Sequence, residues 1–165
     1  GLTLPQSDAE ILKVASGCAM IQTVRRDELV ELPGGGGRLP RPIRRQYLSE
    51  IIEPRAEEIF TLLRKEILRS GYEENLGAGV VLTGGGSKLD GLTDLGERVF
   101  KLPFRRGNPI GIGGLVEVVN GPAFATAVGL VQYGASASER VYRSAEAPAS
   151  GGVIDRFKRY LSEFF

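Results

Sequence analysis

The feature that most constrains the fold of this chain is the stretch 79–91, where a short apolar run leads into three consecutive glycines. Residues 79–82 are mainly β-branched and apolar, which predicts a buried strand. Residues 88–99 then carry apolar side chains at helical spacing, at Leu89, Leu92, Leu95 and Val99. Glycines let a ligand approach the backbone because no Cβ stands in the way, and the helix that follows offers N–H groups. A strand, glycine turn and helix in this order favour an α/β fold with a nucleotide site.

Two common glycine motifs do not account for this turn. A P-loop requires the lysine to follow a glycine directly, but Lys88 follows Ser87. A dinucleotide fingerprint can be laid only loosely on Gly84, Gly86 and Gly91, since the spacing is wrong. A strand-to-helix turn that binds no ligand remains the alternative.

Composition narrows the possible functions. The 165 residues have a formal net charge of +1, which gives no sign of a general nucleic-acid binder. The chain has no histidine and a single cysteine, Cys18, so an internal disulfide is excluded and a structural zinc site is not expected. We expect Cys18 to be buried. The sequence shows no membrane span and no signal peptide, which favours a cytoplasmic chain. Because it begins at a glycine and runs directly into a helix, we expect a fragment.

The first expected helix carries the first candidate ligand contacts. Ser7 or Asp8 can cap it, and Gly17 can close it after Ser16. Its predicted buried residues are Ile11, Leu12 and Ala15. Glu10 and Lys13 are three residues apart on one face, where they form either a solvated ion pair or part of a ligand site.

Further along the chain, the pattern predicts several elements that frame the glycine turn. They are a hairpin of residues 19–24 and 28–32, a helix over 43–71 that breaks or kinks at Pro54, a strand over 100–105 interrupted at Pro103, an irregular loop over 107–114, a helix that begins near Pro122, and a flexible linker over 135–152. The apolar face of the long helix is expected to pack on a sheet through Leu48, Ile52, Ile59, Leu63 and Ile67. Just beyond Pro54, the charged residues Arg55, Glu57 and Glu58 form either a solvated face or a partner surface.

The terminal residues 153–165 have the pattern of an amphipathic helix. At about 100° per residue, the apolar side chains fall within an arc of roughly 140°. These are Val153, Ile154, Phe157, Tyr160, Leu161, Phe164 and Phe165. Arg156, Lys158 and Arg159 lie outside the arc and can face anionic lipid. A helix of roughly 20 Å is too short to span a bilayer, so the pattern predicts an interfacial membrane anchor. Docking on the protein's own domain or on another protein is the alternative.

Several of these segments resemble the FtsA family of bacterial cell-division proteins, which are actin-like ATPases. The resemblance rests on "AEILKVASGCA", "IEPR", "GVVLTGGGSKLDGL", a helix rich in small residues around Ala127, and the terminal helix, in that order. Thr126 is bulkier than the small residue expected there, so that part of the match is incomplete. Together these segments cover nearly the whole chain.

The resemblance implies an α/β fold, namely the C-terminal half of an actin-like (ribonuclease H-like) fold with a terminal amphipathic helix behind a flexible linker. Subdomain IIA would comprise residues 1–16 and 77–134, and subdomain IIB residues 17–76. The implied cofactor is ATP, with Mg²⁺ held by residues outside this chain. Implied nucleotide-binding residues are Glu10, Lys13, Gly84, Gly85, Gly86 and Lys88. No catalytic residue or metal ligand is assigned, and the chain by itself is expected to be inactive, with at most weak ATPase activity in the whole protein.

The resemblance also implies a structural role in cell division. The whole protein would polymerise and tether FtsZ filaments to the cytoplasmic side of the inner membrane at the division site. Arg55 and Glu58 would bind the C-terminal tail of FtsZ, and the terminal helix would bind anionic lipid. Another ATPase of the actin superfamily, such as a pilus-assembly ATPase, a chaperone or a sugar kinase, is the alternative.

Overall fold

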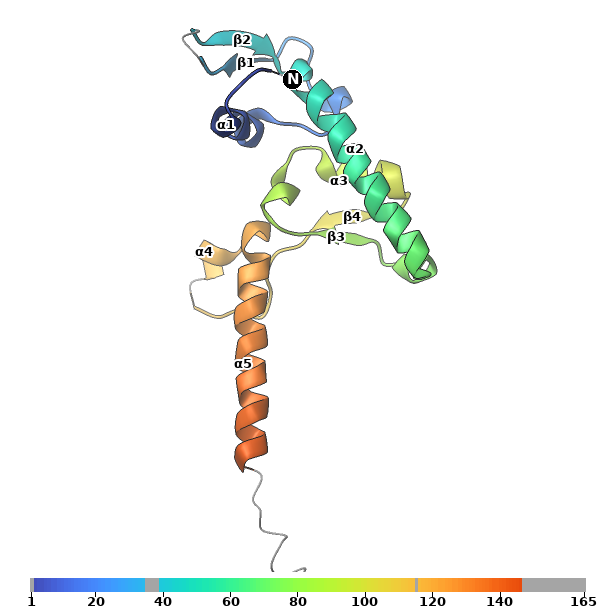
Figure 1. Cartoon of the computed structure of the whole chain (residues 1–165), viewed down its shortest axis with the longest axis vertical. Helices are drawn as coiled ribbons and strands as arrows, with labels where there is room; N and C mark the ends of the chain where they lie inside the picture. Colours follow the sequence, from blue (N-terminus) through green and yellow to red (C-terminus); the bar gives the residue numbers. More distant parts are fainter. Residues whose placement is uncertain (1, 35–38, 115, 147–165) are drawn as a thin grey trace, which may run out of the picture. The chain divides into compact units, whose positions relative to one another are not determined.

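The computed structural model describes residues 2–34, 39–114 and 116–146, which form helices and small sheets (Figure 1). The chain divides into two compact units, residues 1–126 and 127–165. The elements in order are α1 (Gln6–Ser16), η1 (Ile21–Thr23), β1 (Leu29–Leu32), β2 (Arg41–Arg44), α2 (Arg45–Ser70), η2 (Glu73–Leu76), β3 (Val80–Leu82), η3 (Gly85–Lys88), α3 (Leu92–Phe100), β4 (Phe104–Arg106), α4 (Val116–Val119), η4 (Pro122–Phe124) and α5 (Ala125–Glu146), where η denotes a short 3₁₀ turn.

Helix α1 ends where the sequence predicts but starts earlier. The N–H of Gly17 donates to the carbonyl of Lys13 at 2.8 Å and closes the helix. The residue before the first turn is Pro5, so the prediction that Ser7 or Asp8 caps the helix is wrong. Proline suits this position because its fixed φ is compatible with a helix start.

Only part of the predicted buried face of α1 is buried. Leu12 is 5% exposed and packs with Leu32 and Leu48 in a small core. Ile11 is 63% exposed and Ala15 is also exposed, so the predictions for these two residues are wrong. Only one side of α1 packs against the β1–β2 hairpin and the start of α2. This contact covers less of the helix than the apolar face predicted from the sequence.

The predicted hairpin has different strands. Residues 19–24 contain η1 instead of a strand, and β1 pairs antiparallel with β2, with Val30 opposite Ile43. The two strands are therefore consecutive in the chain, separated by the segment between Leu32 and Arg41, and Pro42 lies within β2. Pairing is decided by which apolar faces can be buried together, and both Val30 and Ile43 pack against the Leu12 core.

Helix α2 runs unbroken from Arg45 to Ser70 and ends at Gly71, whose φ is +74°. Pro54 lies inside it, so the helix does not break there, and the alternative of a kink at Pro54 stays a prediction. Packing supplies most of the stability of helices in proteins, and here residues on both sides of Pro54 are buried. The lost backbone hydrogen bond does not outweigh that burial.

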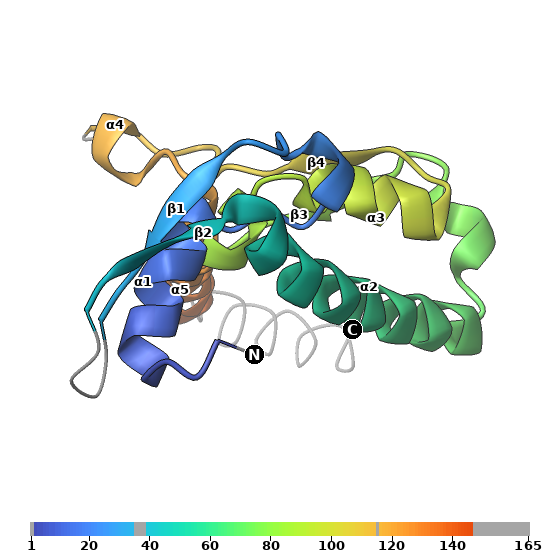
Figure 2. The same cartoon turned by 90° about the horizontal axis from the view of Figure 1, so that it is seen from above.

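The buried face of α2 matches the prediction in part, because Leu48 is buried and Ile52 and Ile67 pack against the main core. It consists of Leu48, Ser49, Glu53, Ala56 and Phe60, while Ile59 and Leu63 are 45% and 49% exposed. This face packs against α3, which lies alongside α2 in Figure 2, and Phe60 also contacts Phe104 of the β3–β4 sheet, so the predicted packing on a sheet is confirmed in part.

The main core lies where α2, α3 and β4 meet. Phe60 makes edge-to-face contacts with Phe100 and Phe104, at ring-centroid distances of 6.1 and 5.7 Å. Leu95 and Ala19 are fully buried in the same cluster. Aromatic pairs of this geometry add to the stabilisation that burial alone provides.

The strand–glycine-turn–helix unit is present with shifted boundaries. β3 is confirmed and pairs parallel with β4 in a two-stranded sheet, but it is only partly buried, with Val81 46% exposed. The helix begins at Leu92, because Gly91 has a φ of +69° and separates it from η3. The predicted strand over 100–105 is shortened to β4, which starts after Pro103, since Phe100 ends α3.

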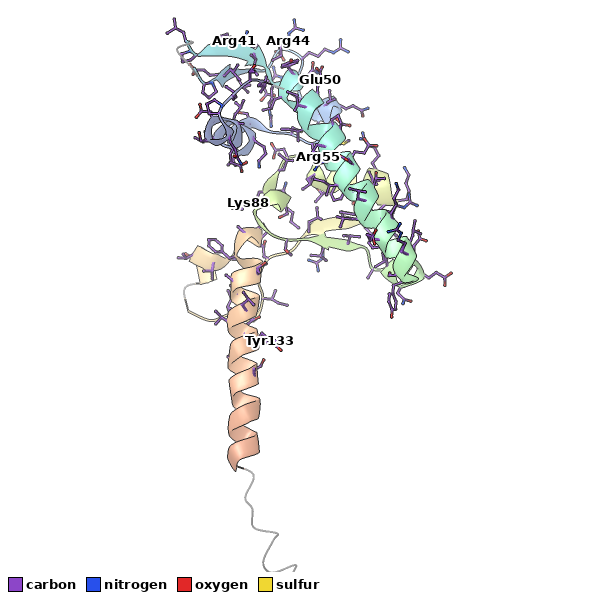
Figure 3. The ribbon with its side chains drawn as sticks, in the orientation of Figure 1. Arg41, Arg44, Glu50, Arg55, Lys88 and Tyr133 are labelled. Atoms are coloured by element: carbon purple, nitrogen blue, oxygen red, sulfur yellow. The ribbon has the colours of Figure 1, made fainter. Side chains whose placement is uncertain are left out.

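Helix α5 follows the predicted turn at Pro122 and extends to Glu146. The flexible linker predicted from residue 135 is therefore wrong up to Glu146, and residues 147–152 lie outside the described residues. Alanine, serine and glutamate lack apolar bulk, but alanine and glutamate are strong helix formers. Leu130, Val131 and Tyr133 are exposed on α5, and Figure 3 labels Tyr133.

Candidate functional site

The glycine turn after β3 is held in place by the surrounding backbone. The N–H of Gly84 donates to the carbonyl of Pro122 at 2.7 Å, which joins the turn to η4. Ser87 is buried, and its Oγ donates to the carbonyl of Gly84 at 2.8 Å. Gly84 has a φ of +85°, a conformation that glycine adopts without strain. The turn is therefore a defined structure.

Space is open around all three glycines of the turn. A Cβ built on Gly84, Gly85 or Gly86 would meet no atom of the described residues within 4 Å. Gly85 and Gly86 do not have positive φ values, so the backbone conformation does not require glycine there. By contrast, a Cβ on Gly96 would overlap the ring of Phe104. Packing against Phe104 therefore accounts for a glycine at position 96. No such packing accounts for Gly85 and Gly86, which leave room for a ligand to approach the backbone.

An apolar groove of about 490 Å³ lies between the glycine turn, α2 and α1. Its lining includes Ile51, Ile52, Ile59 and Phe60 from α2, Leu89 and Leu92 from the segment after the turn, and Gly86 itself. Ile51 and Ile59 are partly exposed because they form its wall. The groove is thus a surface that the described residues leave uncovered.

Two cations stand in the lining of this groove. Lys13 comes from α1, where its Nζ is 2.6 Å from Glu10, and Arg55 comes from α2, where it pairs with Glu58. All four side chains are largely exposed. Exposed ion pairs contribute only about 0–1 kcal/mol, so a bound ligand can replace these partners at small cost.

The structure brings together some of the predicted site residues. Lys13, Gly86 and Arg55 line one groove, although Arg55 was assigned to a partner surface and the other two to a nucleotide site. Lys88 is exposed at the end of η3, and Figure 3 labels it together with Arg55. The predicted membrane-binding residues Ile154, Arg156, Phe157, Lys158, Arg159, Tyr160, Leu161, Phe164 and Phe165 lie outside the described residues.

Sequence reasoning missed a buried carboxylate beside the groove. Glu53 is 9% exposed and accepts hydrogen bonds from the N–H of Ile21 at 2.6 Å and from Arg98 at 2.7 Å. It therefore joins η1, α2 and α3. Glu53 lies on the same face of α2 as Ser49, Ala56 and Phe60, and this helical spacing could have indicated its burial. A charged residue on a buried face requires hydrogen-bond or ionic partners.

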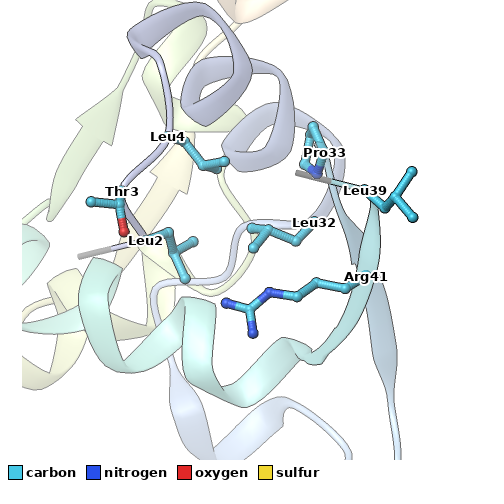
Figure 4. Close-up of a pocket in the computed structure, with 7 residues that line it drawn as sticks. All are labelled: Leu2, Thr3, Leu4, Leu32, Pro33, Leu39 and Arg41. Carbon is cyan, nitrogen blue, oxygen red and sulfur yellow. The ribbon is translucent and has the colours of Figure 1, made fainter. Parts of the chain in front are cut away.

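A second pocket, of about 450 Å³, lies between the N-terminal segment and the β1–β2 hairpin. Leu2, Leu4 and Leu32 lie around it, and the side chain of Arg41 points into it from β2 (Figure 4). Leu2 and Leu4 pack against the Leu12 core, so this pocket borders the packing of the hairpin.

The described part of the chain has neither a membrane-spanning helix nor a cluster of metal-binding side chains. No helix there is both long and apolar enough to cross a membrane. The same residues contain no cluster of three or more Cys, Asp or Glu side chains that could hold a metal ion.

Fold and site together define a mixed α/β chain in which a strand–glycine-turn–helix unit borders an apolar groove with cationic residues. The family model described as "Cell division protein FtsA" matches residues 1–129. The chain is 40% identical to cell division protein FtsA of Pseudomonas aeruginosa over 173 residues, covering 99% of this chain and 41% of the relative. It is 40% identical to the Escherichia coli protein of that name, covering 98% and 41%. The Neisseria meningitidis protein is 35% identical, with 99% and 41% covered.

The chain therefore belongs to the FtsA family of cell division proteins. It spans about 41% of the length of these curated relatives. Among the interpretations of the sequence, the family match favours the cell-division protein over a pilus-assembly ATPase, a chaperone or a sugar kinase.

Proposed function

We propose that residues 1–126 form one side of an ATP site in an actin-like cell-division protein. The supporting observation is that Lys13 and Gly86 line the same apolar groove next to a glycine turn with open space around it. A purine ring has two apolar faces, which suit the leucine and isoleucine lining, and the glycine turn lets the nucleotide approach the backbone.

The described residues fit the adenosine part of the nucleotide better than its phosphates. The lining is mainly apolar, which suits a base, and Lys13 supplies a cation from α1 at the edge of the groove. We propose that Gly84, Gly85, Gly86 and Lys88 face the adenosine and phosphate side and that Glu10 and Lys13 form the opposite wall. Mg²⁺ would be held by residues outside this chain.

Gly85→Val in the whole protein tests this proposal. The fold can accept a side chain at Gly85, because its Cβ position is open and its φ is not positive. We expect ATP binding, measured by titration, to weaken at least tenfold, which corresponds to about 1.4 kcal/mol.

Gly77→Val is the matched control, since Gly77 also has an open Cβ position and a helical backbone but lies outside the glycine turn that borders the groove. This variant should retain wild-type affinity. If folded Gly85→Val binds ATP as tightly as the control, the proposed site is wrong.

We propose further that the whole protein polymerises and tethers FtsZ filaments to the cytoplasmic side of the inner membrane at the division site. Arg55 and Glu58 are proposed to bind the C-terminal tail of FtsZ. Their exposure supports this role, because both side chains are available to a peptide at the surface of α2.

Residues 153–165 are proposed to anchor the protein to anionic lipid. The supporting evidence is the separation of apolar and cationic residues along the sequence. Each buried Phe or Leu contributes about 1.5–3 kcal/mol and each Arg or Lys about 1 kcal/mol, while ordering the segment offsets much of this. One copy would therefore bind weakly, and a filament of many copies would bind well through avidity.

A further inference from the structure

One partly buried arginine connects three separate segments around the proposed nucleotide site. The guanidinium of Arg45, the first residue of α2, donates to the carbonyl of Ser16 at 2.8 Å, to Glu28 at 2.9 Å and to Asp90 at 2.9 Å. Its side chain is only 18% exposed. The backbone N–H of Arg45 also donates to the carbonyl of Glu28 at 2.9 Å. A single planar group thus has partners on α1, the segment before β1, and the segment before α3.

Two of these partners lie in segments that contribute lining residues to the groove. Ser16 is the last residue of α1, the helix that carries Lys13. Asp90 directly follows Leu89, which lines the groove after the glycine turn. The contact is reinforced by the backbone, because the carbonyl of Asp90 accepts a hydrogen bond from the N–H of Ala19 at 2.7 Å. Arg45 therefore joins the end of α1 to the glycine-turn segment.

The chemistry of arginine suits this position. The last carbonyls of a helix have no partner within the helix and carry partial negative charge, so a cation beside Ser16 is stabilising. The guanidinium fork is rigid and holds its partners in fixed directions, which the single ammonium of lysine cannot do. Burial disfavours the charged form, but the hydrogen bonds with Glu28 and Asp90 outweigh burial and raise the pKa of Arg45 above its ordinary value.

We propose that Arg45 is a positioning residue that sets the spacing between α1 and the glycine turn, and thereby the affinity for the nucleotide. This inference rests on the function proposed above. Arg45 does not line the groove, so its effect would pass through the carbonyl of Ser16 and the carboxylate of Asp90.

The test combines a distance measurement with ligand binding in the whole protein. Spin labels on Ala9 in α1 and Asp94 in α3, both exposed, report the distance between the two walls by pulsed electron resonance. Arg45→Gln should broaden that distance distribution and weaken ATP binding at least tenfold. Arg45→Lys should show a smaller change of both quantities. Arg25→Gln is the control, because Arg25 is exposed and its ion pair within the described residues is with nearby Asp27. This variant should change neither quantity.

Asp90→Asn provides a second variant in case Arg45→Gln does not fold, since Asp90 is 64% exposed and loses a single contact. In the double variant Arg45→Lys with Asp90→Asn, the loss of ATP affinity should be smaller than the sum of the two single losses. Both changes weaken the same contact between Arg45 and Asp90. A purely structural role would lower the melting temperature and leave the affinity of the folded protein unchanged.

The outcomes separate this inference from the proposed function. An unchanged distance distribution in Arg45→Gln and Asp90→Asn overturns the positioning role. A broadened distribution with wild-type ATP affinity overturns the link to the nucleotide. A wild-type protein that does not bind ATP refutes the proposed function and this link with it, and the distance measurement still decides whether Arg45 holds α1 to the glycine turn.

Discussion

Glu53 and Glu57 allow a direct comparison of a buried and an exposed carboxylate on one helix. They lie one turn apart on α2, and both accept a hydrogen bond from Arg98, at 2.7 Å and 3.2 Å. The side chain of Glu53 is 12% exposed, whereas that of Glu57 is 50% exposed. Only Glu53 also accepts the backbone N–H of Ile21. Replacing each by alanine makes the same change in helix propensity, so the difference isolates the buried contacts.

The expected cost of Glu53→Ala follows from the hydrogen bonds that it removes. Each hydrogen bond to a charged group contributes about 1.5–3 kcal/mol, and two are lost. Arg98 is 35% exposed and keeps Glu57 as a partner, which lowers the net cost to about 2–4 kcal/mol. Glu57→Ala removes one solvent-screened contact and should cost about 0–1 kcal/mol.

Urea-induced unfolding measures both variants. With a slope of about 2 kcal/mol per molar, a difference of about 2 kcal/mol separates the two midpoints by about 1 M. Glu53→Gln should fall between wild type and Glu53→Ala, because the amide keeps one acceptor without the charge. If the two alanine variants unfold within about 0.3 M urea of each other, burial does not decide the strength of these contacts and the reasoning is refuted.

Three further predictions concern packing, partner binding and the membrane. Gly96→Ala places a methyl group against an aromatic ring of β4 and should destabilise the fold by about 1–3 kcal/mol in urea unfolding. The control Gly129→Ala, with an open Cβ position in α5, should not destabilise the fold. Equal unfolding midpoints for the two variants would contradict the packing argument. Arg55→Glu should weaken binding of an FtsZ tail peptide in fluorescence anisotropy without changing the melting temperature, and unaltered binding with weakened ATP affinity would assign Arg55 to the nucleotide groove instead. Phe157→Glu with Phe164→Glu should abolish co-sedimentation with anionic liposomes, and the membrane proposal fails if the variant still pellets or the wild type never does.

Several elements were predictable because their signals are local. The apolar run of β3, the closing glycine of α1 and the positive-φ Gly71 after α2 each act through neighbours in the sequence. The Glu10–Lys13 pair likewise follows from helical spacing. The ordered set of short segments was also sufficient to indicate the FtsA family, which the comparisons then showed.

The errors arose where local signals compete with packing. Pro54 weakens a helix locally, but burial on both sides of it keeps α2 continuous. The strand predicted over residues 28–32 was assigned the wrong partner. The alternation of apolar and polar residues indicates a strand but does not identify the segment with which it pairs. The start of the predicted linker is helical because alanine and glutamate favour a helix even without apolar bulk.

The sequence by itself determined the local elements, the glycine turn and the family of this protein. Tertiary structure alone decided that Lys13, Gly86 and Arg55 line one groove, that Glu53 is buried, and that Arg45 connects α1 to the glycine-turn segment. Arg45 and Asp90 are 45 residues apart in the chain, as are Glu53 and Arg98. Periodicity and capping rules describe contacts within a few residues, whereas these contacts exist only after folding has brought distant segments together.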